Sequence, residues 1–110
     1  MKQKEIWFAD LNPVEGSEQK GYRPVVIISG NLLNQYLQVV IVCPLTTKIK
    51  NYQGNLILEP DKTNNLSATS EVLTFHVRSI SKSRLVKKIG EISNAELTKV
   101  KTGLDDILRY

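Results

Sequence analysis

The side chains that most often bind zinc or supply a reactive thiol are scarce in this chain of 110 residues. It has one His and one Cys, His76 and Cys43, so the paired His and Cys ligands of a zinc site are absent. The acidic residues are scattered, and Gly16 and Gly21 do not fit a phosphate-binding or dinucleotide-binding loop. No local pattern supports a Ser-His-acid triad. These observations favour chemistry without a metal or cofactor, or plain binding.

Basic residues are segregated from acidic ones, although the net charge is only +4. No Asp or Glu occurs between residues 19 and 58, nor within residues 72–90. Such segregation can build one positive face for a polyanion such as RNA, or simply a solvated basic surface. The basic residues in these two stretches are Lys20, Arg23, Lys48, Lys50, Arg78, Lys82, Arg84, Lys87 and Lys88.

The length and apolar content predict one domain over residues 1–110, with one hydrophobic core. The N-terminus has no apolar stretch typical of a secretory signal, and no segment approaches the roughly 20 apolar residues of a membrane span. Cys43 lies in an apolar run and reads as a small buried hydrophobic residue. A reducing cytoplasm is the expected location, with no membrane association.

The elements that must position any site are mostly strands. We expect strands at residues 5–10, 24–29, 38–45, 55–59, 71–75 and 87–92, a helical turn at 31–37 and an exposed loop at 12–22. The apolar runs at 24–29 and 38–45 are typical of strands buried on both faces. Several short strands and one terminal helix predict a mainly β (α+β) fold with a strongly bent sheet or small barrel.

The C-terminal segment changes to helical periodicity. Ser93 and Glu96 fit a capping box, in which each residue binds an N–H group at the start of the helix. Apolar residues then recur at spacings of three and four and should pack mainly on the core. Gly103 weakens this helix by roughly 1 kcal/mol relative to Ala. The apolar stripe comprises Leu97, Val100, Leu104, Ile107 and Leu108.

Three segments occur in order across nearly the whole chain: DLNPVEGSEQKGYRPV at residues 10–25, VCPLTTK at 42–48 and VRSISKSRL at 77–85. Together they resemble the MazF/PemK family of toxin endoribonucleases. The resemblance implies a Kid/CcdB-like, SH3-like small barrel of antiparallel strands with a C-terminal α-helix. It also implies a homodimer and a cognate antitoxin that occupies the RNA groove.

The resemblance aligns the catalytic Arg and Thr of the family with Arg23 and Thr46. Arg23 lies where a glycine-containing loop enters a buried strand, and its guanidinium can donate two parallel hydrogen bonds to a phosphate. The alternative is a surface Arg paired with an acid, worth about 0–1 kcal/mol. The Thr46 hydroxyl can bind a non-bridging oxygen, or it can cap a turn, and Thr47 is the nearest rival for the same role.

The remaining site residues come from the matched motifs and the basic stretches. Glu18 is expected to assist proton transfer, and the tyrosines at 22, 36 and 52 are candidates for base stacking, although Tyr36 more simply fits a half-buried sheet residue. The implied chemistry is attack of the ribose 2′-OH on the adjacent phosphorus, which gives 2′,3′-cyclic phosphate and 5′-OH ends without a metal. The expected RNA-binding residues are Ser17, Gln19, Lys20, Tyr22, Thr47, Lys48, His76 and Arg78.

The chain departs from the family pattern at one pair of positions. Where the family usually has a carboxylate followed by Gln, this sequence has Phe75 and His76. His76 can replace the missing base because imidazole exchanges protons near neutral pH, or it can be an ordinary strand-end residue. Glu18 is the other candidate base. The loss also leaves room for a non-catalytic toxin that binds a protein target such as DNA gyrase, and for a housekeeping RNA-binding module.

Overall fold

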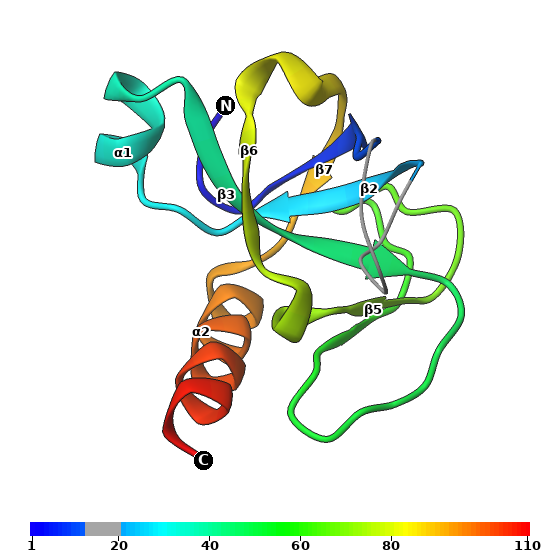
Figure 1. Cartoon of the computed structure of the whole chain (residues 1–110). Helices are drawn as coiled ribbons and strands as arrows, with labels where there is room; N and C mark the ends of the chain where they lie inside the picture. Colours follow the sequence, from blue (N-terminus) through cyan, green and yellow to red (C-terminus); the bar gives the residue numbers. More distant parts are fainter. Residues whose placement is uncertain (13–20) are drawn as a thin grey trace.

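The computed structural model describes residues 1–12 and 21–110. These residues contain seven antiparallel strands and two α-helices (Figure 1). Two short 3₁₀ turns, η1 (Thr74–His76) and η2 (Lys82–Arg84), flank one of the strands. The elements in chain order are β1 (Glu5–Asp10), β2 (Tyr22–Ile27), α1 (Asn31–Tyr36), β3 (Val39–Thr46), β4 (Ile57–Leu58), β5 (Ser70–Val72), β6 (Arg78–Ser81), β7 (Leu85–Glu91) and α2 (Asn94–Arg109).

The sheet curls around its central strand, β3. Its order is β4-β5-β3-β2-β1-β7, and β6 also pairs with β3. Two strands pair with the edge of β3 that faces away from β2: β6 pairs with residues 39–42 and β5 pairs with residues 45–46. The η1 turn redirects the chain between these two partners, so the sheet splits and bends into a half-barrel. This curled antiparallel sheet with a C-terminal helix confirms the predicted fold class.

The central strands are buried on both faces, as their continuous apolar runs predict. Successive side chains of a strand point to opposite faces, so Val26 belongs to one cluster while Val25 and Ile27 belong to another. The first cluster also contains Cys43 and the core residues of α2, and the second contains Ala9 from β1. β2 and β3 therefore provide a rigid base for any side chain at their ends.

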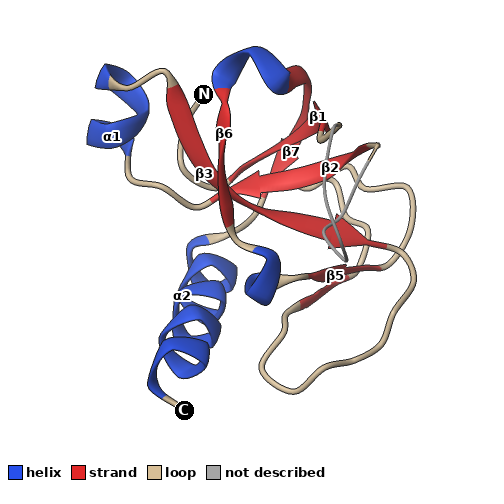
Figure 2. Cartoon of the chain, viewed as in Figure 1, coloured by secondary structure: helices blue, strands red, loops and turns tan. Residues whose placement is uncertain are grey.

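Helix α2 packs beside the sheet through Leu97, Val100 and Leu104, and its C-terminal turn extends beyond the core (Figure 2). The predicted capping box is present: Ser93 Oγ accepts from the Glu96 N–H at 3.1 Å, and Glu96 Oε1 accepts from the Ser93 N–H at 2.8 Å. The expectation that the apolar stripe packs mainly on the core holds for Leu97, Val100 and Leu104 but not at its end, where Ile107 is 46% and Leu108 86% exposed. The helix extends beyond the sheet there. Within residues 1–12 and 21–110, no helix has the length and apolar character to cross a membrane.

Other departures from the predicted elements have local causes. The strand expected at 71–75 ends at Val72 and gives way to η1, in which the His76 N–H donates to the Leu73 carbonyl. β6 was not predicted, because only Ile80 of its four residues is buried. Tyr36, expected as a half-buried sheet residue, lies on α1 and is 71% exposed. The described part of the 12–22 loop comprises Asn12 and residues 21–22, and its other residues lie outside the described ranges.

Candidate functional site

A pocket of about 680 Å³ opens where β2 begins and β3 ends. Two strand residues, the loop that follows β3, and the η1 region contribute its walls. The residues that line it are Arg23, Thr46, Lys48, Lys50, Tyr52, Leu73, Phe75 and His76. Four of these are among the residues that the sequence singles out as catalytic or RNA-binding: Arg23, Thr46, Lys48 and His76.

Strand register brings Arg23 and Thr46 together. The antiparallel β2–β3 ladder runs from Ile27–Val42 to Val25–Pro44, and continuing this register by two residues along each strand places Arg23 next to Thr46 on the same face of the sheet. Both side chains line the pocket, where Arg23 is half-buried and Thr46 is 9% exposed. A guanidinium and a hydroxyl thus share one concave site.

Thr46 is held by the backbone that follows it. Its Oγ1 accepts a hydrogen bond from the Lys48 N–H at 3.1 Å. This contact occupies one lone pair of the hydroxyl and restricts its rotation, while a hydroxyl still has one hydrogen to donate. The arrangement suits donation to an oxygen of a bound anion.

Positive charge dominates the pocket. Arg23, Lys48 and Lys50 line it, and no Asp or Glu is present among its described lining residues. Concentrated charge of one sign in a concave site attracts a phosphate group and holds it near the hydroxyl. Across the described parts of the chain, no group of three or more His, Cys, Asp or Glu side chains is placed to hold a metal ion.

The loop that carries both lysines is anchored to a buried carboxylate. Glu71 on β5 is 0% exposed and accepts hydrogen bonds from the N–H groups of Lys50, Asn51 and Tyr52 at 2.8–2.9 Å. The Asn55 side-chain amide donates a fourth at 3.0 Å. Burial alone would raise the pKa of Glu71, but these four hydrogen bonds outweigh it, so the pKa lies below its ordinary value. Sequence reasoning missed this role; the available signal was an acid directly before apolar Val72-Leu73.

Aromatic rings form another wall of the pocket. Phe75 makes an edge-to-face contact with Tyr52, with ring centroids 5.3 Å apart, and lies 4.6 Å from the His76 ring. Phe75 is 47% exposed. The position where the family usually has a carboxylate is therefore occupied by a phenyl ring on η1. His76 lies on this turn, so the alternative of an ordinary strand-end residue is wrong.

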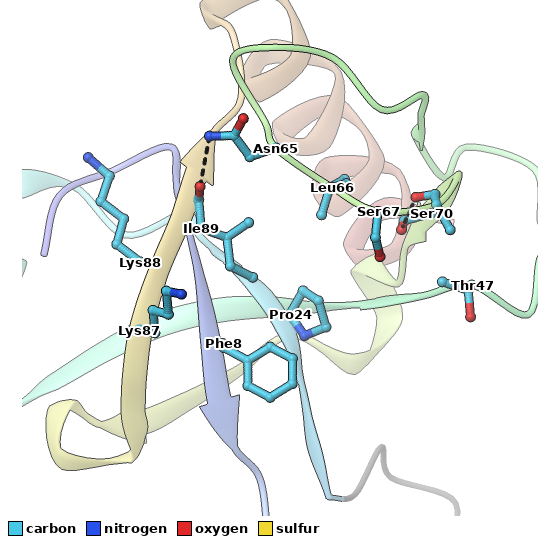
Figure 3. A pocket seen from close by; sticks show the side chains of 11 residues that line it. Phe8, Pro24, Thr47, Asn65, Leu66, Ser67, Ser70, Lys87, Lys88 and Ile89 are labelled. Atoms are coloured by element: carbon cyan, nitrogen blue, oxygen red, sulfur yellow. Dashed lines mark hydrogen bonds between the residues drawn. The ribbon is translucent and has the colours of Figure 1, made fainter.

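A second pocket of about 430 Å³ lies along β1 and β7. Thr47 lines this pocket and not the first, because neighbouring residues Thr46 and Thr47 face different sides of the chain. Figure 3 shows Phe8 beside Pro24, its cross-strand partner, between Lys87 and Thr47. The Phe8 ring stacks on Tyr22 at 6.2 Å between centroids.

The other predicted site residues lie elsewhere. Arg78 lies on β6 opposite Val42 and is half-buried, and it is not among the residues lining the first pocket. Tyr22 begins β2 and is 61% exposed. The four predicted residues in the matched loop, Ser17, Glu18, Gln19 and Lys20, lie outside the described residues.

Solved structures give the class of protein that this fold defines. MazF (Form-I) from Deinococcus radiodurans superposes with a TM-score of 0.86 at 26% identity, covering 100% of this chain and 97% of that one. An endoribonuclease from Mycobacterial species, solved in complex with its cognate antitoxin, has the same fold, with a TM-score of 0.79 at 21% identity over 98% of this chain and 94% of that one. The curled sheet with its C-terminal helix is thus the MazF fold.

Sequence comparison gives the family. The profile described as PemK-like, MazF-like toxin of type II toxin-antitoxin system matches residues 2–108. Endoribonuclease MazF of Staphylococcus saprophyticus is 35% identical over 106 residues, which are 96% of this chain and 88% of that protein. The chain belongs to the PemK-like, MazF-like toxins of type II toxin-antitoxin systems, as its motifs indicate.

Proposed function

We propose that this toxin is a sequence-selective, metal-independent endoribonuclease that cleaves single-stranded RNA, chiefly mRNA, and so stops translation and growth. One observation carries the proposal: a guanidinium, a hydroxyl and two ammonium groups line one pocket. The relative from Staphylococcus saprophyticus is itself named an endoribonuclease, which supports the same activity. RNA is the substrate that these groups suit because it brings its own nucleophile, the ribose 2′-OH.

The proposed reaction is an internal transesterification. The 2′-oxygen forms a bond to the adjacent phosphorus, the bond from phosphorus to the 5′-oxygen breaks, and the products carry a 2′,3′-cyclic phosphate and a 5′-OH. The phosphorane between them gains about one negative charge. Arg23 stabilises this charge with two parallel hydrogen bonds, and Thr46 donates a third. Both act on atoms whose charge develops in the transition state, so they accelerate the step itself.

Proton transfer is assigned to His76 or Glu18. A phenyl ring at position 75 cannot accept the 2′-OH proton, whereas His76 lines the same pocket as Arg23 and Thr46. Imidazole is the side chain best suited to accept and return a proton near neutral pH. Glu18 belongs to the family loop motif and is the alternative base.

We also propose a cognate antitoxin, a homodimer and a cytoplasmic location. The Mycobacterial structure in complex with a cognate antitoxin supports the first. The exposed side chains of Leu32 and Tyr36 on α1 offer apolar surface that a second protomer can cover. An antitoxin that neutralises the toxin by occupying the cationic pocket needs acidic side chains there. The mRNA substrate requires a cytoplasmic enzyme.

The decisive experiment compares two substrates. Purified toxin is incubated with RNA and with the same oligonucleotide carrying a single 2′-deoxy sugar at the cut site, each with and without EDTA. We expect cleavage of the RNA alone, unaffected by EDTA, with cyclic phosphate ends found by mass spectrometry. Cleavage of the 2′-deoxy substrate, or a requirement for magnesium, contradicts the mechanism.

A second candidate, a non-catalytic toxin that binds a protein target such as DNA gyrase, is favoured by Phe75, which lacks the usual carboxylate. The two candidates differ in their dependence on Arg23. Growth arrest by the Arg23→Ala variant, with cellular RNA intact, would establish the binder and exclude the nuclease.

A further inference from the structure

We propose that Glu71 is a positioning residue for RNA binding, which holds the loop that follows β3 at residues 50–55 so that Lys50 and Tyr52 face the substrate. The inference rests on the proposed ribonuclease function. It assigns a role to a side chain that is fully buried and does not line the pocket. Figure 1 shows the loop as a wide arc leaving the end of β3.

The contacts of Glu71 converge on one turn of this loop. Oε1 accepts from the Lys50 N–H at 2.8 Å and the Asn51 N–H at 2.9 Å, and Oε2 accepts from the Tyr52 N–H at 2.9 Å. Three successive N–H groups can point to one anion because Asn51 adopts a left-handed conformation, with φ of 55°. The turn is therefore built around the carboxylate.

The far end of the loop joins the same network. Asn55 donates to Glu71 Oε2 at 3.0 Å and accepts from the Thr74 hydroxyl at 2.7 Å. The carbonyl of Gly54 lies 2.9 Å from the position that a Cβ on Gly103 of α2 would occupy, so a glycine in the helix permits this close approach. The sheet holds the loop through the backbone N–H groups of residues 50–52, η1 holds it through the Asn55 side chain, and α2 packs closely against Gly54. None of these contacts uses a lysine side chain.

The residues that line the pocket are held in two different ways. Arg23 and Thr46 belong to strands and are aligned by the β2–β3 ladder. Lys50 and Tyr52 lie outside any strand or helix, and their N–H groups donate to Glu71, whereas the Lys48 N–H donates to Thr46 Oγ1. Loss of the Glu71 carboxylate should therefore weaken RNA binding while the bond-breaking step proceeds at nearly its normal rate.

The test is Glu71→Gln, with Glu91→Gln as the control at an exposed acid of β7. The glutamine keeps the size of the side chain but turns an NH₂ group toward backbone N–H donors. We expect KM to rise at least tenfold, kcat to stay within threefold, and the control to match wild type. Each lost phosphate contact lowers the slope of log KM against log salt by about 0.7 for a single strand. We therefore expect a smaller slope for Glu71→Gln.

Coupling to a loop lysine tests whether Glu71 acts through the loop. Lys50→Ala should raise KM in the wild-type background and have little further effect in Glu71→Gln. Amide hydrogen exchange at residues 50–52 should be faster in Glu71→Gln. Asn55→Ala, which removes one donor and leaves the three backbone donors, should give a smaller change in the same direction and serves if Glu71→Gln does not fold.

Several outcomes would overturn the proposal: an unchanged KM in folded Glu71→Gln, full additivity with Lys50→Ala, or an activity loss that follows only the unfolded fraction. Affinity for the non-cleavable 2′-deoxy oligonucleotide separates the two proposals. If wild type binds it but cuts no RNA, the ribonuclease proposal fails, while the effect of Glu71 on affinity is still measured.

Discussion

Replacement of Arg23 is the most direct probe of the proposed chemistry. The side chain is half-buried in an open pocket, for which an effective dielectric constant of about 20 is appropriate. One unit of charge developing about 4 Å from the guanidinium is then stabilised by about 4 kcal/mol. Lys48 and Lys50 remain in the variant and recover a small part of this energy. We expect Arg23→Ala to lose about 3–4 kcal/mol of transition-state stabilisation, or a factor of roughly 10²–10³ in kcat.

The assay is single-turnover cleavage of an RNA oligonucleotide with a fluorophore and a quencher at its two ends, at constant ionic strength. Arg23→Lys keeps the charge but loses one of two parallel hydrogen bonds, so we expect a smaller loss of about 1.5 kcal/mol, roughly tenfold. Arg109→Ala is the matched control: it also removes one guanidinium, from an exposed pair with Asp105 on α2, and should cleave at the wild-type rate.

The reasoning would be refuted if Arg23→Ala kept kcat within threefold of wild type while its thermal unfolding midpoint showed a fully folded protein. Equal losses of kcat in Arg23→Lys and Arg23→Ala would also count against it. Lysine keeps the positive charge and alanine removes it, so equal losses would mean that the charge itself has no effect on the rate. A loss confined to KM would assign Arg23 to ground-state binding of RNA.

Three further predictions concern stability and reactivity. Gly90→Ala would bring a Cβ within 2.4–2.6 Å of backbone atoms in a neighbouring turn and should destabilise the fold by at least about 1–3 kcal/mol in urea unfolding, whereas Gly30→Ala meets open space and should cost less than about 1 kcal/mol. Burial raises the pKa of Cys43 to about 12, so a thiol reagent should modify it only as the protein unfolds; rapid labelling of the native state would contradict this. Glu5 and Glu71 are buried, which by itself raises a carboxyl pKa, but their hydrogen bonds prevail and hold each pKa below the ordinary 4.5. The unfolded chain then binds more protons, so stability is complete above about pH 4.5 and falls as pH drops through the folded-state pKa values. Urea unfolding from pH 7 to 3 should show this fall, and Glu71→Gln should reduce it.

Features with a strong local signal could be predicted from the sequence. The apolar runs around Val26 and Val42 specify strands buried on both faces, since such runs satisfy a sheet with a core on each side. Ser93 and Glu96 specify the start of α2, because their side chains bind N–H groups only three residues away. The family motifs then located Arg23 and Thr46, which the β2–β3 register brings into one pocket.

Features that depend on distant partners could not be predicted. The donors of Glu71 lie 16–21 residues away along the chain, so its apolar neighbours Val72 and Leu73 can suggest that it is buried but not which groups it binds. β6 pairs with β3 although only Ile80 supplies a buried side chain, because its place is fixed by the partner strand. The exposure of Leu108 depends on where the sheet ends. Helical periodicity predicts which face of the helix is apolar, but not how far along the helix the core extends.

The position of β1 bears on when a newly made molecule becomes harmful. β1 lies between β2 and β7, and Glu5 pairs with Glu91 near the opposite end of the sequence. Pairings so distant in the chain form late, because the intervening polypeptide must first be ordered. A growing chain on the ribosome therefore lacks one neighbour of its first strand until β7 has emerged. Partial translation products should therefore be inactive. An inhibitor then has the full time of translation in which to be made before the toxin folds.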